Sequence, residues 1–384
     1  MTRGTPVRLR GSTWNHPRGY APLLALADRH APGVVVEWDV RSLRDFGEQS
    51  VATLATQYDL VVFDHPSVGE GARESVIKPL DDLVDSAVLD SLANASVGPS
   101  WDSYLVDGRP YALPIDAAGQ VSASRGDMIQ ALPQSWAEAY ELAAASATAH
   151  ARVALPLVDT DVVCLFMTLL ASSGTPMFAE DHEVADREKV LEILEFMHRL
   201  SKLLHPGSLE WNPIQLLDHM SLTDEISYCP ALFGYSNYSR IDTVAQRLRF
   251  GPIPDWGDHP ARPLLGGAGI AISAFSPHVD IAASVVAELC RSETQRGVYF
   301  YLGGQPAHRD AWTDEGCNVM SSGFFSNTLE SLDNAYLRPR KPGFTSFQAS
   351  AGVILRTDAI IAGNIDLAAE RLDVEWRRLT EELT

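Results

Sequence analysis

Two carboxylates stand where such groups could act on a sugar. Asp64 ends the apolar run Tyr58–Asp64, and Asp116 lies within Gly108–Val121, an apolar segment interrupted by proline. A pair of carboxylates flanking a sugar is the arrangement of a glycosidase acid and base. Carboxylates also bind sugar hydroxyls without any reaction. We favour binding, and hydrolysis by Asp64 and Asp116 stays open, because the sequence does not set the distance between them.

Two further segments carry aromatic and amide side chains that suit a polyhydroxylated ligand. The first, Ser12–Gly19, is dense in hydrogen-bonding groups around Trp14, and the second follows an expected strand that ends near Gly234 and contains two tyrosines. Aromatic faces cover the apolar side of a pyranose, and amides bond to its hydroxyls. The alternatives are that Trp14 caps a sheet edge and that the tyrosines are core aromatics.

Signatures of other chemistries are absent from the sequence. No phosphate loop of the form G-x-x-x-x-G-K-[ST], no G-x-S-x-G elbow and no H-E-x-x-H occurs. The four cysteines, Cys164, Cys229, Cys290 and Cys317, show no C-x-x-C spacing, so we expect buried thiols, with a bridge between Cys290 and Cys317 left open. We therefore expect no cofactor, no metal and no catalytic residue.

The elements that must position these side chains alternate in type near the N-terminus. Expected strands are Pro6–Gly11, Val34–Trp38 and Tyr58–Asp64, and the expected helices between them are Tyr20–His30 and Phe46–Gln57. This alternation is typical of a parallel, doubly wound α/β sheet. Ligands of such sheets bind beyond the carboxyl ends of the strands, where Ser12–Gly19 and Asp64–Ser67 would form loops.

Two helices are predicted further along the chain by local signals. Ser135 followed by Glu138 three residues later has the pattern of a capping box, which predicts a helix running to Ala149. Apolar residues at helical spacing predict an amphipathic helix over residues 187–204.

Length and charge restrict the class of protein. The 384 residues carry 50 acidic and 30 basic side chains, a net charge of −20, which disfavours binding to nucleic acid or to an anionic membrane surface. The longest apolar run, Val162–Ala171, covers about half of the ~20 residues that a transmembrane helix needs. The first 14 residues show no secretory signal.

Several segments together resemble the family 1 extracellular solute-binding proteins, the sugar receptors of ATP-binding-cassette (ABC) importers. The matching segments are Tyr58–His65, Tyr111–Asp116, Leu132–Glu138, Gly266–Ile272 and Ser292–Gln295. The resemblance implies an α/β, two-lobed, periplasmic-binding-protein-like fold of type II, with hinge crossings and a central ligand cleft. The implied crossings lie near residues 113–118, 264–268 and 322–330. The implied N-terminal lobe is 1–115 with 268–325, and the C-terminal lobe is 116–267 with 326–384.

The resemblance also implies which residues contact the ligand. Carried over position by position, they are Trp14, Asn15, His16, Asp64, His65, Asp116, Gln120, Tyr235, Asn237, Tyr238, Gly267, Phe344 and Gln348. In this reading Asp116 binds sugar hydroxyls, although it could instead pair with an arginine at the hinge. Four basic residues could balance the charge of an acidic ligand: His16, Arg18, Arg340 and Lys341. The alternative for Arg18, Arg340 and Lys341 is that they are solvated surface groups.

The function implied is that of a receptor, not an enzyme. Its partners would be a small carbohydrate or sugar acid and the membrane permease of an ABC importer, with no nucleic acid, and the protein would be a monomer. The family places it in the periplasm or otherwise outside the cytoplasm. The alternatives are a carbohydrate-active hydrolase using Asp64 and Asp116, and a cytoplasmic sugar-binding or regulatory protein on the same fold.

Overall fold

The computed structural model describes residues 6–29, 32–42, 49–180, 182–241, 245–341 and 343–381. The chain divides into two units of discontinuous segments. Unit 1 is Met1–Ala118, Gly266–Val319 and Arg340–Pro342, and unit 2 is Gly119–Leu265, Met320–Pro339 and Gly343–Thr384. Two strands pass from one unit into the other: β6 (Leu113–Ser124) between Ala118 and Gly119, and β10 (Leu265–Ile272) at its first residue.

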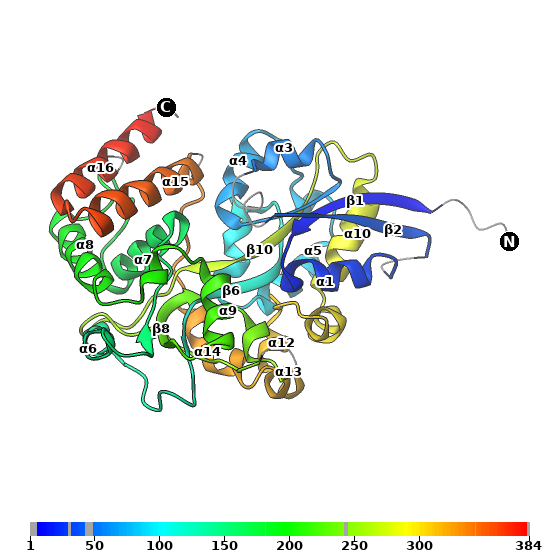
Figure 1. The fold of residues 1–384 in the computed structure, drawn as a ribbon. Helices are drawn as coiled ribbons and strands as arrows, with labels where there is room; N and C mark the ends of the chain where they lie inside the picture. The colour runs from blue at the N-terminus through cyan, green and yellow to red at the C-terminus, as the bar shows by residue number, and fades with distance from the viewer. Residues whose placement is uncertain are drawn as a thin grey trace. The chain divides into compact units, whose positions relative to one another are not determined.

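Unit 1 contains a mixed sheet with strand order β2-β1-β3-β10-β6. The strands β1 (Val7–Trp14), β2 (Val34–Arg41) and β3 (Leu60–Phe63) are parallel, as predicted, and β1 and β2 lie side by side in Figure 1. β10 runs antiparallel to β3, so the expectation of a parallel sheet is wrong for this strand. A parallel neighbour requires a crossover connection, whereas β10 enters unit 1 directly from unit 2.

Apolar residues cover both faces of this sheet. Leu60 and Val62 of β3 belong to one buried cluster, and Val61 and Phe63 belong to another, because successive strand side chains point to opposite faces. Among its described residues, unit 1 has the helices α1 (Pro17–Leu26), α3 (Val51–Ala55), α4 (Val68–Arg73), α5 (Ser86–Ala95), α10 (Val279–Cys290), α11 (Ser292–Thr294), α12 (Arg309–Thr313) and, ending one residue into unit 2, α13 (Glu315–Met320). A π-helical turn, Gln295–Tyr299, follows α11.

Unit 2 has a smaller sheet built on the second half of β6. This half pairs antiparallel with β8 (Ile226–Phe233) and with β9 (Arg249–Gly251), and the short β7 (Arg152–Val153) pairs parallel with β8. Its helices are α6 (Trp136–Ser146), α7 (Asp159–Ser172), α8 (Arg187–Ser201), α9 (Pro213–Leu222), α14 (Phe324–Asp333), α15 (Phe344–Ile354) and α16 (Ile365–Glu381).

Helix α7 forms the centre of unit 2. Every residue from Asp161 to Ser172 is buried, and α7 packs with α8 and α15, which in turn contact α16 (Figure 1). This continuous burial explains the apolar run Val162–Ala171 as a core helix. No helix among the described residues combines the length and the apolar character needed to cross a membrane.

Two helices that were predicted from short sequence patterns begin where the structure has them. Ser135 caps α6, since its side chain accepts a hydrogen bond from the Glu138 amide at 3.2 Å, and the predicted helix over 187–204 is α8. The predicted loop Ser12–Gly19 is wrong over most of its length. β1 continues to Trp14 because it pairs with β2 throughout, and α1 already begins at Pro17.

Two other predictions concern the N-terminal half and the cysteines. The first residues of the predicted helix Phe46–Gln57 lie outside the described residues, and its remainder contains α3. All four cysteines are buried thiols, so the bridge left open between Cys290 and Cys317 is absent.

Candidate functional site

His16 caps helix α1 at the carboxyl end of strand β1. Its Nδ1 accepts a hydrogen bond from the Arg18 amide at 3.1 Å, and the ring is buried. Burial, together with the charge of Arg18, lowers the pKa of His16 to about 3. The ring is therefore neutral near pH 7, and it does not supply the positive charge that an acidic ligand would need.

Arg18 forms a buried ion pair with Asp116. Its Nε donates to Oδ2 of Asp116 at 2.7 Å, a second guanidinium nitrogen bonds to Oδ1, and both residues are at most 4% exposed. Burial raises the pKa of the Asp116 carboxyl, and the adjacent guanidinium opposes that shift. The expectation that Arg18 is a surface group is wrong, and Asp116 has the arginine partner that was the alternative to direct sugar binding.

Trp14 and Asn15 come shortly before Arg18 in the chain. The indole of Trp14 is buried against Gly19, where a Cβ atom would approach the ring to 2.4 Å, whereas Asn15 is exposed. Glycine is thus required at position 19 for α1 to pack on Trp14. Of the three predicted contacts on this segment, Trp14 and His16 are buried, and Asn15 is exposed on the surface of unit 1.

Asp64 and His65 follow strand β3 in a short 3₁₀ turn. The Asp64 carboxylate accepts a hydrogen bond from the His65 amide at 2.8 Å and lies 3.1 Å from Nδ1 of His65. His65 is buried against Tyr104, edge to face, while about a third of the Asp64 side chain (34%) is exposed. β1 and β3 are parallel, so Asn15 and Asp64 follow strands that end at the same edge of the sheet.

Strand β6 is held near Asp116 by backbone contacts that sequence reasoning missed. Nε2 of the buried Gln305 donates to the Ala117 carbonyl at 2.9 Å, and Nε2 of the buried Gln295 donates to the Ile115 carbonyl at 3.2 Å. Gly267, on β10, has φ +113°, and a Cβ atom there would lie 2.4 Å from the Asp116 carbonyl oxygen. The two glutamine contacts join residues 180 and 188 positions apart in the chain, so they had no local signature in the sequence.

Gln120 and the segment Tyr235–Tyr238, which carries the two predicted tyrosine contacts, belong to unit 2. Gln120 is buried and accepts a hydrogen bond from the Thr168 hydroxyl, which itself accepts one from the Leu264 amide at 3.1 Å. Gln120 pairs with Phe233 at the end of β8, and the chain then continues to Tyr235. The structure therefore brings Gln120 close to the start of the tyrosine segment.

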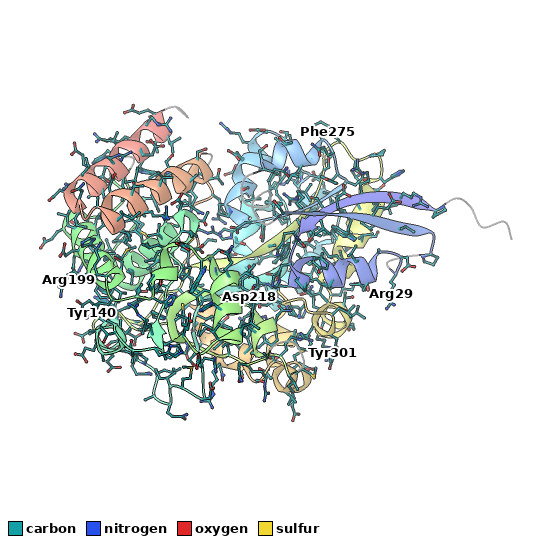
Figure 2. All side chains as sticks on the ribbon, in the orientation of Figure 1. Arg29, Tyr140, Arg199, Asp218, Phe275 and Tyr301 are labelled. Carbon is teal, nitrogen blue, oxygen red and sulfur yellow. The ribbon has the colours of Figure 1, made fainter. Side chains whose placement is uncertain are left out.

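The three predicted contacts after β8 differ in exposure. Tyr238 is 5% exposed and donates its hydroxyl to Asp218 at 2.6 Å, from the 3₁₀ turn Ser236–Ser239 to α9; Asp218 is labelled in Figure 2. Burial of the phenol raises the pKa of Tyr238, and the hydrogen bond to the Asp218 carboxylate, together with its charge, raises it further. Asn237 is also buried, and Tyr235 is half-buried. Tyr238 thus has the core position that was the alternative to a stacking platform.

Phe344 and Gln348 lie on α15. Phe344 is 1% exposed and packs edge to face against Phe178 at 5.5 Å, within an aromatic cluster that also contains Phe347 and Trp376. Gln348 is half-buried and accepts a hydrogen bond from Arg338 at 3.2 Å. In unit 2 Phe344 is a core residue.

One group among the described residues has the ligand types of a metal site. His205, His219 and Glu225, all in unit 2, have ligand atoms within 4.8 Å of one another. None of the three is among the predicted contacts. Their spacing along the chain matches no metal signature, so the sequence did not indicate them.

Comparison with known proteins identifies what the chain is similar to. The family model described as bacterial extracellular solute-binding protein matches residues 47–315. No curated protein sequence matches the chain.

Solved structures share the fold over almost the whole chain. An ABC transporter solute-binding protein of Agrobacterium radiobacter K84, in complex with ribitol, is 20% identical with a TM-score of 0.81, covering 97% of this chain and 98% of that one. Maltose-bound MalE3 of T. maritima is 17% identical with a TM-score of 0.79, covering 98% and 100%. An ABC transporter solute-binding protein of Agrobacterium vitis S4, with bound D-mannitol, is 18% identical with a TM-score of 0.78, covering 98% and 99%.

Proposed function

The chain belongs to the bacterial extracellular solute-binding proteins, whose family model matches residues 47–315, and we propose that it is the carbohydrate receptor of an ABC importer. Family membership confirms the resemblance found in the sequence. Similar structures carry ribitol, D-mannitol and maltose, which supports a polyhydroxylated ligand. The proposal places the protein outside the cytoplasm as a monomer, with a membrane permease as its partner.

One observation carries the choice of ligand contacts. The carboxyl ends of the parallel strands β1 and β3 share an edge, and there Asn15 is exposed and Asp64 is about one third exposed. An amide and a carboxylate can bond to several hydroxyls of one sugar. We assign direct contact to Asn15, Asp64 and the half-buried Tyr235, and we assign positioning of the backbone to Asp116, Gly267 and Gln120.

The charges of the described residues favour a neutral ligand over a sugar acid. Two of the four basic groups that could balance an acid do not offer a net charge: His16 is neutral, and the charge of Arg18 is compensated by Asp116. A neutral sugar or polyol needs no compensating charge. The proposed ligand class is therefore a neutral sugar or polyol.

The same ion pair disfavours the hydrolase alternative. A glycosidase needs one carboxyl group to exchange a proton and another to act as base or nucleophile. Both oxygens of Asp116 are bonded to the Arg18 guanidinium, which stabilises the ionised form and occupies two of its roughly four lone-pair sites. We propose binding without turnover.

We also propose boundaries for the two lobes. The N-terminal lobe comprises residues 1–115 and 268–325, and the C-terminal lobe comprises residues 116–267 and 326–384.

Isothermal titration calorimetry tests the function. The ligands are ribitol, D-mannitol, D-tagatose, maltose and, as an acid, gluconate. We expect saturable heat with at least one neutral ligand and at least about tenfold weaker binding for Asp64→Asn, because a charged hydrogen bond is lost. The matched control Asp90→Asn changes an exposed carboxylate on α5 and should bind normally. No heat with any ligand, combined with hydrolysis of chromogenic glycosides, would support the hydrolase instead.

A further inference from the structure

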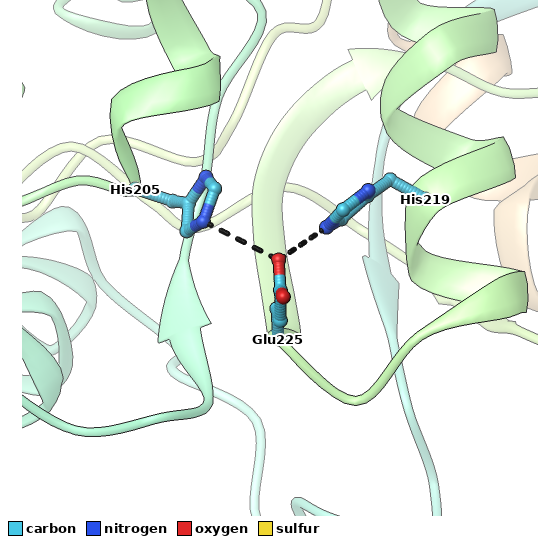
Figure 3. A group of neighbouring side chains, drawn as sticks. All are labelled: His205, His219 and Glu225. Carbon is cyan, nitrogen blue, oxygen red and sulfur yellow. Dashed lines mark hydrogen bonds and ion pairs between the residues drawn. The ribbon is translucent and has the colours of Figure 1, made fainter.

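Three side chains from three elements of unit 2 converge on one point near its surface. His205 precedes the 3₁₀ turn Pro206–Leu209, His219 lies in the last turn of α9, and Glu225 directly precedes β8. Figure 3 shows both imidazoles directed at the carboxylate between them. Oε2 of Glu225 lies 2.8 Å from Nε2 of His219 and 3.7 Å from Nε2 of His205.

Trp211 packs against both imidazole rings. The indole stacks on His205, with ring centroids 5.1 Å apart and an angle of 17°, and lies 4.3 Å from the His219 ring. Gly207 allows this packing, because a Cβ atom there would approach the indole to 2.4 Å. The two imidazole side chains are only 19% and 24% exposed, so packing orients them, while Glu225 is 42% exposed and leaves the point open to solvent.

The ligand types and spacing match a divalent transition metal. Two imidazole nitrogens and one carboxylate oxygen, with water in the fourth position, form a common Zn²⁺ site. Bonds of about 2.0–2.1 Å in a tetrahedron place neighbouring ligand atoms about 3.3 Å apart. The observed 2.8 and 3.7 Å differ from this by a few tenths of an ångström, which side-chain torsions can supply. We propose that His205, His219 and Glu225 bind one Zn²⁺ ion at the surface of unit 2.

The surroundings of His205 shift its pKa. Burial, then the neighbouring His219 and Arg152, lowers the pKa of His205, against the opposing effect of Glu225. His205 therefore stays neutral over a wider pH range than an exposed histidine.

The two histidines are not equivalent as ligands. The Gly207 amide donates to Nδ1 of His205 at 3.1 Å, so the proton of the neutral ring is on Nε2, where the metal would bind. When zinc takes Nε2, the proton moves through solvent to Nδ1 and the hydrogen bond from Gly207 is lost. Metal-binding histidines usually donate from the other nitrogen instead. His205 is thus the weakest ligand of the three.

A competition titration against a chromophoric zinc chelator tests the site. The protein is the full chain, free of any histidine tag and stripped of metal with EDTA. We expect one equivalent of Zn²⁺ to bind, with affinity at least tenfold weaker in His219→Ala and in Glu225→Gln and less reduced in His205→Ala. The matched control is His182→Ala, which removes an exposed histidine of the same unit that is not part of the group, and should leave the affinity unchanged.

Two results would overturn the proposal. One is an absence of zinc binding by wild-type protein whose circular dichroism spectrum shows it folded. The other is binding that persists in the folded double variant His219→Ala/Glu225→Gln.

A second readout tests the role of His205 without a substitution. In protein labelled with ¹⁵N-glycine, saturating zinc should shift the amide resonance of Gly207, because its hydrogen bond to His205 is broken. The matched reference is Gly33, whose Cβ position has no neighbour within 4 Å and which lies in unit 1. An unchanged Gly207 resonance at saturating zinc would contradict a three-residue site.

Discussion

The Arg18 guanidinium and the Asp116 carboxylate neutralise each other inside unit 1, although 98 positions separate them in the chain. The carboxylate that looked most like a sugar contact therefore has a fixed partner, and the exposed part of the candidate site moves to Asn15 and Asp64. Removing one member of a buried pair leaves an uncompensated charge, so this pair is a structural constraint on the edge that carries the proposed contacts.

The buried imidazole of His16 should make the stability of the protein depend on pH. Its pKa is about 3 when folded and 6.5 ordinarily, so the unfolded chain binds more protons between these values. The stability contributed by neutral His16 is complete above pH 6.5 and is lost as the pH falls towards 3, by up to about 1.4 kcal/mol per pH unit.

Urea denaturation of wild type and His16→Asn over this pH range measures the effect. Asparagine keeps a side-chain acceptor at the N-cap but does not titrate. We expect the free energy of unfolding to fall less steeply with decreasing pH in the variant. Equal slopes in the two proteins would mean that His16 is not responsible.

At the scale of elements, β6 is the strand that both sheets share. Buried glutamine amides bond to its carbonyls on the unit 1 side, and the Thr168 hydroxyl bonds to the Gln120 side chain on the unit 2 side. β6 carries three large apolar side chains, Leu113, Ile115 and Val121, among several small residues, and these polar contacts add to its buried packing.

Substitution of Gly267 tests how closely β10 approaches β6. Gly267→Ala should destabilise the protein by at least about 3 kcal/mol, because φ is +113° and the new Cβ atom would meet the Asp116 carbonyl at 2.4 Å. Gly33→Ala is the matched control, with positive φ but open space around it, and should cost about 1 kcal/mol. Equal losses in urea denaturation would show that the close approach contributes nothing.

At the scale of the whole molecule, the net charge of −20 does not predict the charge of the candidate site. Acidic side chains are in excess, yet the best-buried charges of unit 1 form a neutral pair. The overall acidity therefore describes the surface that meets solvent, and it gives no reason to expect either an acidic or a basic ligand.

Salt dependence distinguishes a neutral from an acidic ligand. Interactions between charges are screened beyond about 10 Å at 0.1 M salt, whereas hydrogen bonds to a neutral polyol are not. We expect the Kd of the best neutral ligand to change by less than about twofold between 0.05 and 0.5 M NaCl. A Kd that rises steeply with salt would indicate an acidic ligand and contradict the proposed ligand class.

Local patterns in the sequence determined much of the secondary structure. The apolar run before Asp64 is strand β3, the apolar spacing after residue 187 is helix α8, and Ser135 caps α6. These features depend on residues a few positions apart, where backbone periodicity and side-chain capping act directly. The family resemblance, confirmed by the match over residues 47–315, also came from such short segments in order.

Only the tertiary structure decided the long-range pairings. The antiparallel place of β10 beside β3, the Arg18–Asp116 pair and the meeting of His205, His219 and Glu225 all join distant parts of the chain. A residue type says which bonds a side chain can make, whereas packing decides which partner is within reach and whether the group is buried. For that reason the sequence by itself indicated a solute-binding fold, and the structure separated the exposed Asn15 and the partly exposed Asp64 from the buried Asp116, Tyr238 and Phe344.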